Sequence, residues 1–375
     1  MKRLVAQWVQ WIFSWLPLSR NKMLFVSYYG SQYGCSPKYL SEYIVRRHPE
    51  WKVMWAFTQP EKHAVDGVRK VRYLSLRYFY ELSTSRVFVT NYRTTTPYRK
   101  RKGQHYLQTW HNSLRLKQIE GDAEAMLPPH YVALAKADSC KVDLVLSGCR
   151  FSDETIARAF WYGGPVLPSG MPRNDLFFAP DAAARRERIK AKLNIPSATR
   201  LLLYAPTFRQ SYTLACYDLD YDRLIRRLEA VRGGKWKILV RLHPHLRMRS
   251  QELLDGCDMV DVTRYDDMQE LLLAADLLVT DYSSSMFDFA LTRRPCLLYV
   301  PDIEAYRTQD RPLYFDLSEL PFPACRSQQE LEEALAPTDD AARAAAIGTF
   351  LTRVGSYEDG HASERVAATI RQWMA

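Results

Sequence analysis

Two histidines follow short apolar runs of strand length, a position from which a side chain can reach a bound ligand. His111 comes after residues 105–109, and His243 comes after residues 236–241. A neutral imidazole in such a place can take a proton from a hydroxyl nucleophile. We therefore predict His111 and His243 as catalytic residues, although either one taken alone is also compatible with a hydrogen-bonded structural histidine.

Hydroxyl and guanidinium groups follow three apolar runs in the second half of the chain. Residues 204–209 read YAPTFR, residues 239–245 read LVRLHPH, and residues 279–288 read VTDYSSSMFD. The last run predicts a strand, a hydroxyl-rich turn and the start of a helix, where backbone N–H groups bind anions. Ordinary capping of a helix by Ser and Asp is the alternative for that run. Together with the histidines, these segments indicate phosphoryl or diphosphate chemistry.

Strand-like and helical patterns alternate along the chain after residue 22, which predicts parallel βαβ units. We expect strands at residues 23–29, 53–58, 86–90, 105–109, 143–147, 201–204, 236–241, 259–262, 277–280 and 296–300. We expect helices at residues 37–47, 76–83, 221–231, 268–274 and 284–292.

The chain has 375 residues, which is too many for one ordinary core. A charged, helical stretch at residues 179–199 marks a junction. We therefore expect an α/β fold with two Rossmann-type, doubly wound domains, residues 21–178 and residues 179–375, facing a cleft. In such open sheets ligands bind at the carboxyl ends of the strands, where the polar segments fall.

Residues 1–20 (MKRLVAQWVQWIFSWLPLSR) predict an amphipathic helix, because their polar residues recur along one narrow stripe. From residue 4 to residue 16 this helix would be about 20 Å long, whereas a bilayer core is about 30 Å thick. Trp8, Trp11 and Trp15 favour the headgroup zone. We therefore predict that the segment lies on the inner face of a membrane; a helix packed on the body of the protein is the alternative.

The chain carries 52 Lys and Arg against 42 Asp and Glu, a formal net charge of +10. An anionic membrane, an anionic substrate or nucleic acid would suit this charge. The densest cluster, residues 99–102, is either a patch for phosphates or lipid headgroups or an exposed loop. No nucleic-acid motif accompanies the cluster, so we expect no nucleic-acid partner.

The seven cysteines are scattered, odd in number and free of Cys-x-x-Cys spacing. This pattern favours reduced thiols in the cytoplasm over a disulfide framework or a structural zinc site. The sequence has no P-loop and no dinucleotide fingerprint. The Asp-x-Asp pairs within residues 218–222 are interpreted as solvated surface, so no metal is expected.

Five segments, in order, resemble those of the CDP-glycerol glycerophosphotransferases, which build teichoic-acid and related capsular polymers. Residues 108–117 (QTWHNSLRLK) resemble the family element Gln-Thr-Trp-His-Gly-Thr-x-x-Lys. The others are residues 170–175 (GMPRND), 204–209, 280–288 followed by the Arg-Pro pair at 294–295, and 299–306. The likeness runs from about residue 33 to residue 306, most of the chain.

The resemblance implies a GT-B-like pair of domains, acceptor-side at residues 21–178 and CDP-alditol-binding at residues 179–375. The family transfers glycerol phosphate from CDP-glycerol to a hydroxyl and releases CMP, with no cofactor. The implied partners are a CDP-alditol donor, a lipid-linked glycan or polymer acceptor and the cytoplasmic face of the cell membrane, where the protein would be peripheral. His111 would be the general base, and His243 would contact the donor diphosphate. The implied substrate-binding residues are Arg173, Asn174, Thr207, Arg209, Arg241, Thr280, Asp281, Ser283 and Ser284.

The sequence departs from the family pattern after the first histidine, where Asn112, Ser113 and Leu114 replace Gly, Thr and Pro. Because Asn tolerates a left-handed backbone, the turn can survive. The chain length favours addition of a single unit over polymerisation. Two alternatives stay open: a GT-B glycosyltransferase that uses a nucleotide sugar, and a non-catalytic, membrane-bound assembly factor.

Overall fold

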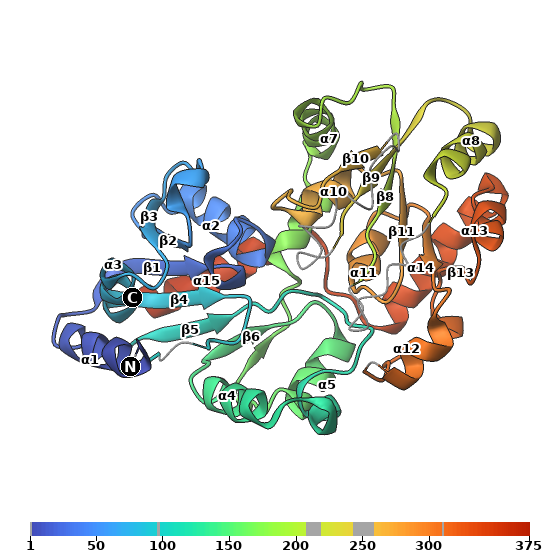
Figure 1. The fold of residues 1–375 in the computed structure, drawn as a ribbon. Coiled ribbons are helices and arrows are strands. Elements are labelled where there is room, and N and C mark those ends of the chain that lie inside the picture. The colour runs from blue at the N-terminus through green and yellow to red at the C-terminus, as the bar shows by residue number, and fades with distance from the viewer. Residues whose placement is uncertain (1, 96–97, 208–218, 243–258, 310) are drawn as a thin grey trace. The chain divides into compact units, whose positions relative to one another are not determined.

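The computed structural model describes residues 2–95, 98–207, 219–242, 259–309 and 311–375, which form two compact units (Figure 1). The first unit combines Met1–Ser113, Ile119–Phe178 and Tyr357–Ala375, and the second combines Leu114–Gln118 and Ala179–Ser356. Each unit is built on a parallel sheet. The predicted α/β class with two parallel-sheet domains is therefore confirmed.

The first unit holds a sheet with the strand order β3-β2-β1-β4-β5-β6-β7. Its strands are β1 (Ser19–Val26), β2 (Lys52–Phe57), β3 (Arg69–Arg72), β4 (Ser85–Thr90), β5 (His105–Gln108), β6 (Leu144–Leu146) and β7 (Val166–Leu167). The order reverses direction between β1 and β4, so the carboxyl ends of these strands form the topological switch point where ligands bind in doubly wound sheets. The middle strands are continuous apolar runs, typical of strands that are covered on both faces.

The helices of the first unit connect these strands. They are α1 (Lys2–Phe13), α2 (Cys35–Arg47), α3 (Leu76–Thr84), α4 (Pro129–Ser139), α5 (Arg150–Ala159), α6 (Asp175–Phe178) and α15 (Ala362–Met374). The helix predicted within residues 1–20 runs from Lys2 to Phe13, after which Ser14 still donates its N–H to the carbonyl of Gln10, whereas Ser19 and Arg20 belong to β1. In the described part of the chain, no helix combines the length and the hydrophobicity that crossing a bilayer requires.

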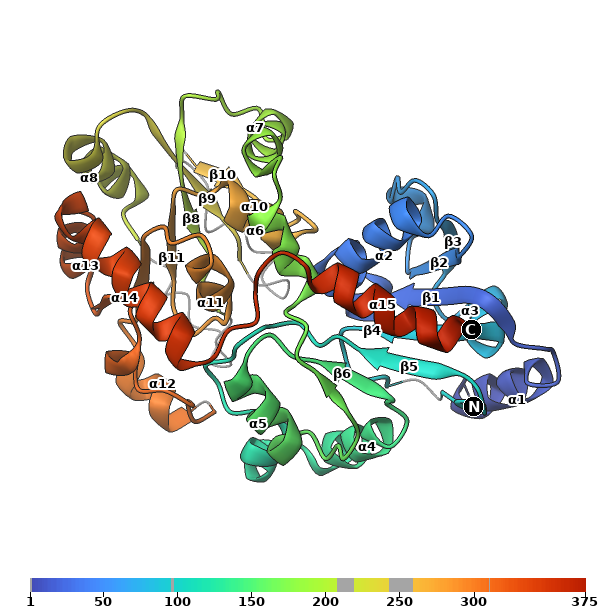
Figure 2. The same cartoon turned by 180° about the vertical axis from the view of Figure 1, so that it is seen from behind.

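Helix α15 packs on the first sheet beside α2, although it lies at the far end of the chain (Figure 2). Val366 and Ile370 share one buried core with Leu40 of α2 and Phe25 of β1. The carboxylate of Asp175 accepts the first two N–H groups of the helix, from Ala362 and Ser363, at 2.9 and 2.8 Å. Residues 357–375 therefore belong to the first unit, whereas the division expected from the sequence placed them in the second domain.

The second unit holds a sheet with the strand order β10-β9-β8-β11-β12-β13. Its strands are β8 (Arg200–Tyr204), β9 (Trp236–Val240), β10 (Met259–Asp261), β11 (Leu277–Thr280), β12 (Cys296–Tyr299) and β13 (Ala324–Cys325). Its helices are α7 (Ala182–Lys192), α8 (Tyr221–Arg232), α10 (Met268–Ala274), α11 (Ser285–Ala290), α12 (Ile303–Gln309), α13 (Gln328–Ala334) and α14 (Asp340–Arg353). The switch point of this sheet lies between β8 and β11.

Candidate active site

His111 follows β5 in the first unit and lies beside the carboxyl end of β4. Its Nδ1 is 3.3 Å from the backbone carbonyl oxygen of Asn91. Because a carbonyl only accepts hydrogen bonds, this contact requires a proton on Nδ1 and leaves the lone pair of a neutral imidazole on Nε2. The geometry therefore gives His111 the tautomer that a general base needs.

The turn that carries His111 is fixed by buried polar contacts. Gln108 is fully buried; its amide donates to the carbonyl of Tyr92 at 2.9 Å, and its side-chain oxygen accepts the N–H of Trp110 at 3.0 Å. Trp110 has a φ of 52°, a left-handed conformation that only strong local contacts hold in a bulky residue. Its ring stacks on the imidazole of His111 with 4.7 Å between centroids.

A buried arginine that the sequence analysis did not identify supports this turn. Arg93 forms ion pairs with Glu120 and Asp138 at 3.3 and 3.7 Å. Its guanidinium lies 5.6 Å from the centroid of the Trp110 ring, within cation–π range. Arg93 comes three residues after β4, and this position after a strand is the sequence feature that could have identified it.

Arg173 and Asn174 were predicted to bind substrate, and both are buried in contacts within the first unit. The guanidinium of Arg173 donates to the backbone carbonyl of His111. The amide of Asn174, which is fully buried, donates to the carboxylate of Glu358 at 2.8 Å. The same carboxylate accepts the N–H of Met171 at 3.1 Å. Glu358 is 184 residues from Asn174, so no local pattern pointed to it.

In the second unit, one carboxylate ties the ends of β8 and β11 together. Asp281 is 1% exposed and accepts the N–H and the hydroxyl of Thr207 at 2.9 and 2.6 Å, as well as the N–H of Tyr282 at 2.6 Å. The hydroxyl of Thr280 donates to the carbonyl of Ala205 at 2.7 Å. The structure therefore brings together three residues that the sequence predicted for donor binding: Thr207, Thr280 and Asp281.

Ser283 and Ser284 lie half-buried in the turn after β11, before the short helix α11. The hydroxyl of Ser283 accepts the N–H of Ser285 at 3.3 Å. Arg241 follows β9 and donates from its guanidinium to the carbonyl of Tyr265 at 2.6 Å, while its N–H bonds to the carbonyl of Tyr204 at 2.8 Å. The guanidinium group therefore follows β9 and the hydroxyl groups follow β11, the two strands that flank β8 in this sheet.

Two buried tyrosines that the sequence analysis gave no role pack beside these strand ends. The rings of Tyr282 and Tyr306 stack with 3.6 Å between centroids. The Tyr282 hydroxyl donates to Asp302 at 3.0 Å, and the ammonium group of Lys117 lies 5.1 Å from the Tyr306 ring. Both tyrosines lie within the motifs quoted above, which was the available signal.

The remaining predicted residues are Arg209, His243 and the three tryptophans of the N-terminal segment. Arg209 and His243 lie outside the residues that the structure describes. Trp8, Trp11 and Trp15 are exposed on or just after α1. In the part of the chain that the structure describes, no three His, Cys, Asp or Glu side chains come together as metal ligands.

The Asp-x-Asp pairs at residues 218–222 are described only in part. Asp218 lies outside the described residues, whereas the side chain of Asp220 accepts the N–H of Arg223 at 2.9 Å. Asp220 therefore caps the N-terminus of α8.

Curated relatives place the chain in one family of enzymes. It is 33% identical over 369 residues to the teichoic acid poly(glycerol phosphate) polymerase of Bacillus subtilis, covering 95% of this chain and 49% of that protein. It is 32% identical to the teichoic acid glycerol-phosphate transferase of Staphylococcus aureus, covering 99% of this chain and 98% of that protein. The chain thus spans about half the length of the first curated relatives it matches and nearly all of the transferase.

A solved structure has the same fold. A histidine variant of the wall teichoic acid polymerase TagF, soaked with CDPG, superposes with a TM-score of 0.85 at 29% identity, covering 100% of this chain and 93% of that one. The sequence pattern of the CDP-Glycerol:Poly(glycerophosphate) glycerophosphotransferase family matches residues 9–372. On this evidence the chain belongs to the CDP-glycerol:poly(glycerophosphate) glycerophosphotransferase family.

Proposed function

We propose that this protein transfers glycerol phosphate, or a related alditol phosphate, from CDP-glycerol to a hydroxyl of a membrane-linked glycan or polymer, releasing CMP. The observation that carries the proposal is the placement of His111, whose Nδ1 faces the carbonyl of Asn91, so that a neutral ring carries its basic lone pair on Nε2. The names of the relatives and the CDPG soak of TagF support the donor and the reaction class.

In the proposed reaction the acceptor hydroxyl attacks the phosphorus that bears the glycerol. The new P–O bond forms as the P–O bond to CMP breaks, and the hydroxyl proton passes to Nε2 of His111. The imidazolium that results stacks on Trp110, an aromatic face that favours a cation. A positioned base of this kind contributes about 10²–10⁴ in rate.

The second unit is proposed to hold the donor. Ser283, Ser284 and Arg241 would contact the diphosphate, because their hydroxyl and guanidinium groups follow strands of the second sheet. Arg209 and His243 are proposed for the same role from the family motif. Thr207, Thr280 and Asp281 would shape the pocket, since their mutual hydrogen bonds fix the strand ends.

Arg173 and Asn174 are proposed to act by positioning. Arg173 holds the carbonyl of His111, and Asn174 holds the segment that contains Arg173 through Glu358. The first unit would thus supply the base and the acceptor side, and the second unit would supply the donor.

We also propose that the protein is peripheral on the cytoplasmic face of the cell membrane, attached through residues 1–20. Trp8 and Trp15 are 65% and 76% exposed, and Trp11 lies between them with ring centroids 5.9 and 5.7 Å away. Exposed tryptophans of this kind favour the headgroup zone of a bilayer. Removal of residues 1–20 should therefore release the protein from membranes in fractionation; unchanged membrane association would overturn this part of the proposal.

The donor is tested by incubating the purified chain and a lipid-linked acceptor with CDP-glycerol, CDP-ribitol or a UDP-sugar. We expect CMP release with a CDP-alditol and no UDP release from UDP-sugars. UDP release instead would move the assignment to a nucleotide-sugar glycosyltransferase. Absence of both products, with membrane binding intact, would favour a non-catalytic assembly factor.

A further inference from the structure

Helix α1 is attached to the first unit through the side that carries Ala6, Gln10 and Phe13, so its larger apolar face is turned outward. Gln10 is 2% exposed; its amide donates to the carbonyl of Ala6 at 3.2 Å and its side-chain oxygen accepts the backbone N–H of Arg99 at 3.0 Å. The ring of Phe13 also packs edge-on against Tyr80. Large apolar side chains remain exposed on the other side of the helix: Leu4, Val5, Trp8, Trp11 and Ile12.

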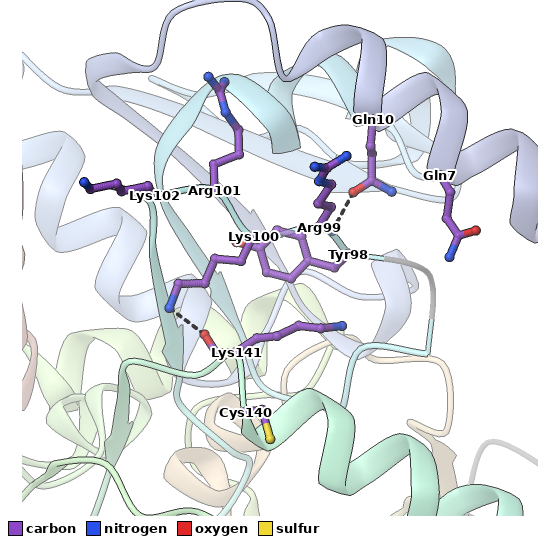
Figure 3. Close-up of a pocket in the computed structure, with 9 residues that line it drawn as sticks. All are labelled: Gln7, Gln10, Tyr98, Arg99, Lys100, Arg101, Lys102, Cys140 and Lys141. Carbon is purple, nitrogen blue, oxygen red and sulfur yellow. Dashed lines mark hydrogen bonds between the residues drawn. The ribbon is translucent and has the colours of Figure 1, made fainter.

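The contact between Gln10 and Arg99 brings the densest basic cluster of the chain against this helix. A cavity of about 800 Å³ lies there, lined by Gln7 and Gln10 of α1, residues 99–102 and Lys141 (Figure 3). None of the described residues that line it is acidic. The cavity is therefore an electropositive hollow beside an exposed apolar helix face.

The charges around the cavity differ in how they are held. Lys100 pairs with the carboxylate of Asp143 at 2.5 Å, so its charge is largely compensated. Arg101 donates to the carbonyl of Ser83 at 2.7 Å, and the ammonium of Lys141 lies 6.0 Å from the ring of Tyr98. Arg99 and Lys102 carry exposed side chains. A bond to a neutral carbonyl leaves the charge of Arg101 in place, so Arg99, Arg101, Lys102 and Lys141 together supply the positive charge that a ligand would meet.

Figure 3 shows that these side chains leave the segment in different directions rather than converging on one point. A single tightly bound phosphate needs converging donors, whereas a layer of headgroups needs cations spread along one surface. The apolar face of α1 next to the cations matches the boundary between headgroups and acyl chains. The arrangement therefore favours an anionic bilayer over a soluble anion.

We infer that the cavity between α1 and residues 99–102 receives the phosphate headgroups of anionic phospholipids while the outward face of α1 enters the same bilayer. This inference rests on the proposed membrane attachment and adds to it a lipid preference. It also gives a role to the cluster at residues 99–102, which has no part in the proposed transfer reaction.

The test is co-sedimentation of the full chain with vesicles of phosphatidylcholine alone or of phosphatidylcholine with 30% phosphatidylglycerol, roughly the anionic share of a charged leaflet. The wild type should bind the anionic vesicles more tightly. The double variant Arg99→Gln/Lys102→Gln should lose about 25-fold in affinity for them, because each basic residue near an anionic surface contributes about a fivefold factor. Its affinity for the neutral vesicles should not change.

A matched variant, Arg226→Gln/Lys235→Gln, removes the same charge from exposed positions on and near α8. An equal loss of affinity in this variant would overturn the inference, because it would show that binding depends on the net charge of the protein and not on the position of Arg99 and Lys102. Unchanged binding of the Arg99/Lys102 variant to anionic vesicles would also overturn it, as would displacement of the wild type from vesicles by millimolar inorganic phosphate.

Transfer of glycerol phosphate from CDP-glycerol to a soluble glycerol-phosphate oligomer is measured on the same preparations, with CMP release as the readout. The Arg99/Lys102 variant should keep the wild-type rate, which also shows that it is folded. If the wild type releases no CMP but keeps its preference for anionic vesicles, the proposed function fails and the headgroup site stands. If CMP is released but the preference is absent, the headgroup site alone fails.

Discussion

The turns after β5 and β11 both follow the carboxyl end of a strand in a parallel sheet, yet they are held by different chemistry. In the first unit, buried ion pairs of Arg93 with Glu120 and Asp138 lie against the ring of Trp110. In the second unit, the single carboxylate of Asp281 collects donors from two strand ends.

The difference follows from what each turn is proposed to do. A base must hold one ring nitrogen at a fixed position, and the stack of Arg93, Trp110 and His111 restrains the ring from one side while Asn91 holds Nδ1. A diphosphate site needs hydroxyl and N–H donors at the strand ends. The scaffold of the second unit gathers its own polar groups on one buried acceptor, and Ser283 and Ser284 lie half-buried in the turn beside it. Breaking each scaffold should therefore have a different consequence.

The largest effect on stability is expected from Arg93→Met. This change leaves Glu120 and Asp138 buried without their cation, which should lower the free energy of unfolding by about 3–5 kcal/mol. Urea unfolding measures the loss. Arg158→Met is the matched control, because Arg158 pairs with Asp122 on the surface and its loss should lower the free energy by less than about 1 kcal/mol. Equal losses in both variants would show that the buried ion pairs of Arg93 contribute no more to stability than a surface ion pair.

A smaller loss is expected from Asp281→Ala. The change leaves the buried N–H groups of Thr207 and Tyr282 without their acceptor, at a cost on the order of 2–4 kcal/mol in the free energy of unfolding. It should also raise the KM for CDP-glycerol, because the strand ends that carry the donor residues loosen. Asp222→Ala, an exposed acidic residue at the start of α8, is the control and should cost about 0.3–1 kcal/mol. A stable variant with an unchanged KM would contradict this role of Asp281.

The smallest effect is a dependence on pH in the Arg93 cluster. Burial raises the pKa of Asp138 above its ordinary range, against the opposing effects of Thr94 and Arg93. Between the ordinary and the raised pKa the folded state binds more protons than the unfolded state, so ionised Asp138 opposes folding at neutral pH and this opposition fades as the pH falls. The variant Asp138→Asn is the reference, because its side-chain amide does not titrate in this pH range.

The stability of the wild type relative to Asp138→Asn should therefore increase as the pH is lowered from neutral toward the ordinary aspartate pKa. Urea unfolding of both proteins at each pH measures the gap. A stability of the wild type relative to Asp138→Asn that falls on acidification would mean that the Arg93 ion pair outweighs burial in setting the pKa of Asp138.

Sequence alone predicted the middle of both sheets well, because strands buried on both faces are continuous apolar runs. The predicted strand at residues 277–280 and helix at residues 268–274 coincide with β11 and α10. Strand β3 was missed because its sequence, RKVR, is that of a charged edge strand. Strands β7 and β13 are two residues long and carry no periodic signal.

Site residues that directly follow a strand could be predicted from the sequence. Site contacts between residues far apart along the chain could not. His111 and Asp281 follow strands, and the alternation of elements places such residues at the carboxyl ends of the strands of a parallel sheet. The docking of α15 on the first sheet and the bond from Asn174 to Glu358 join residues more than 180 positions apart. Such contacts depend on tertiary packing, so Arg173 and Asn174 could not be recognised from the sequence as buried residues.

The most direct test of the transferase proposal is the rate of CMP release from CDP-glycerol by His111→Ala, with His361→Ala as the control. His361 is an exposed histidine of the same unit that lies outside the site. We expect the turnover of His111→Ala to fall about 10²–10⁴-fold with little change in KM, and the control to match the wild type. A His111→Ala protein that folds, binds CDP-glycerol and releases CMP at the wild-type rate would contradict the assignment of His111 as the base.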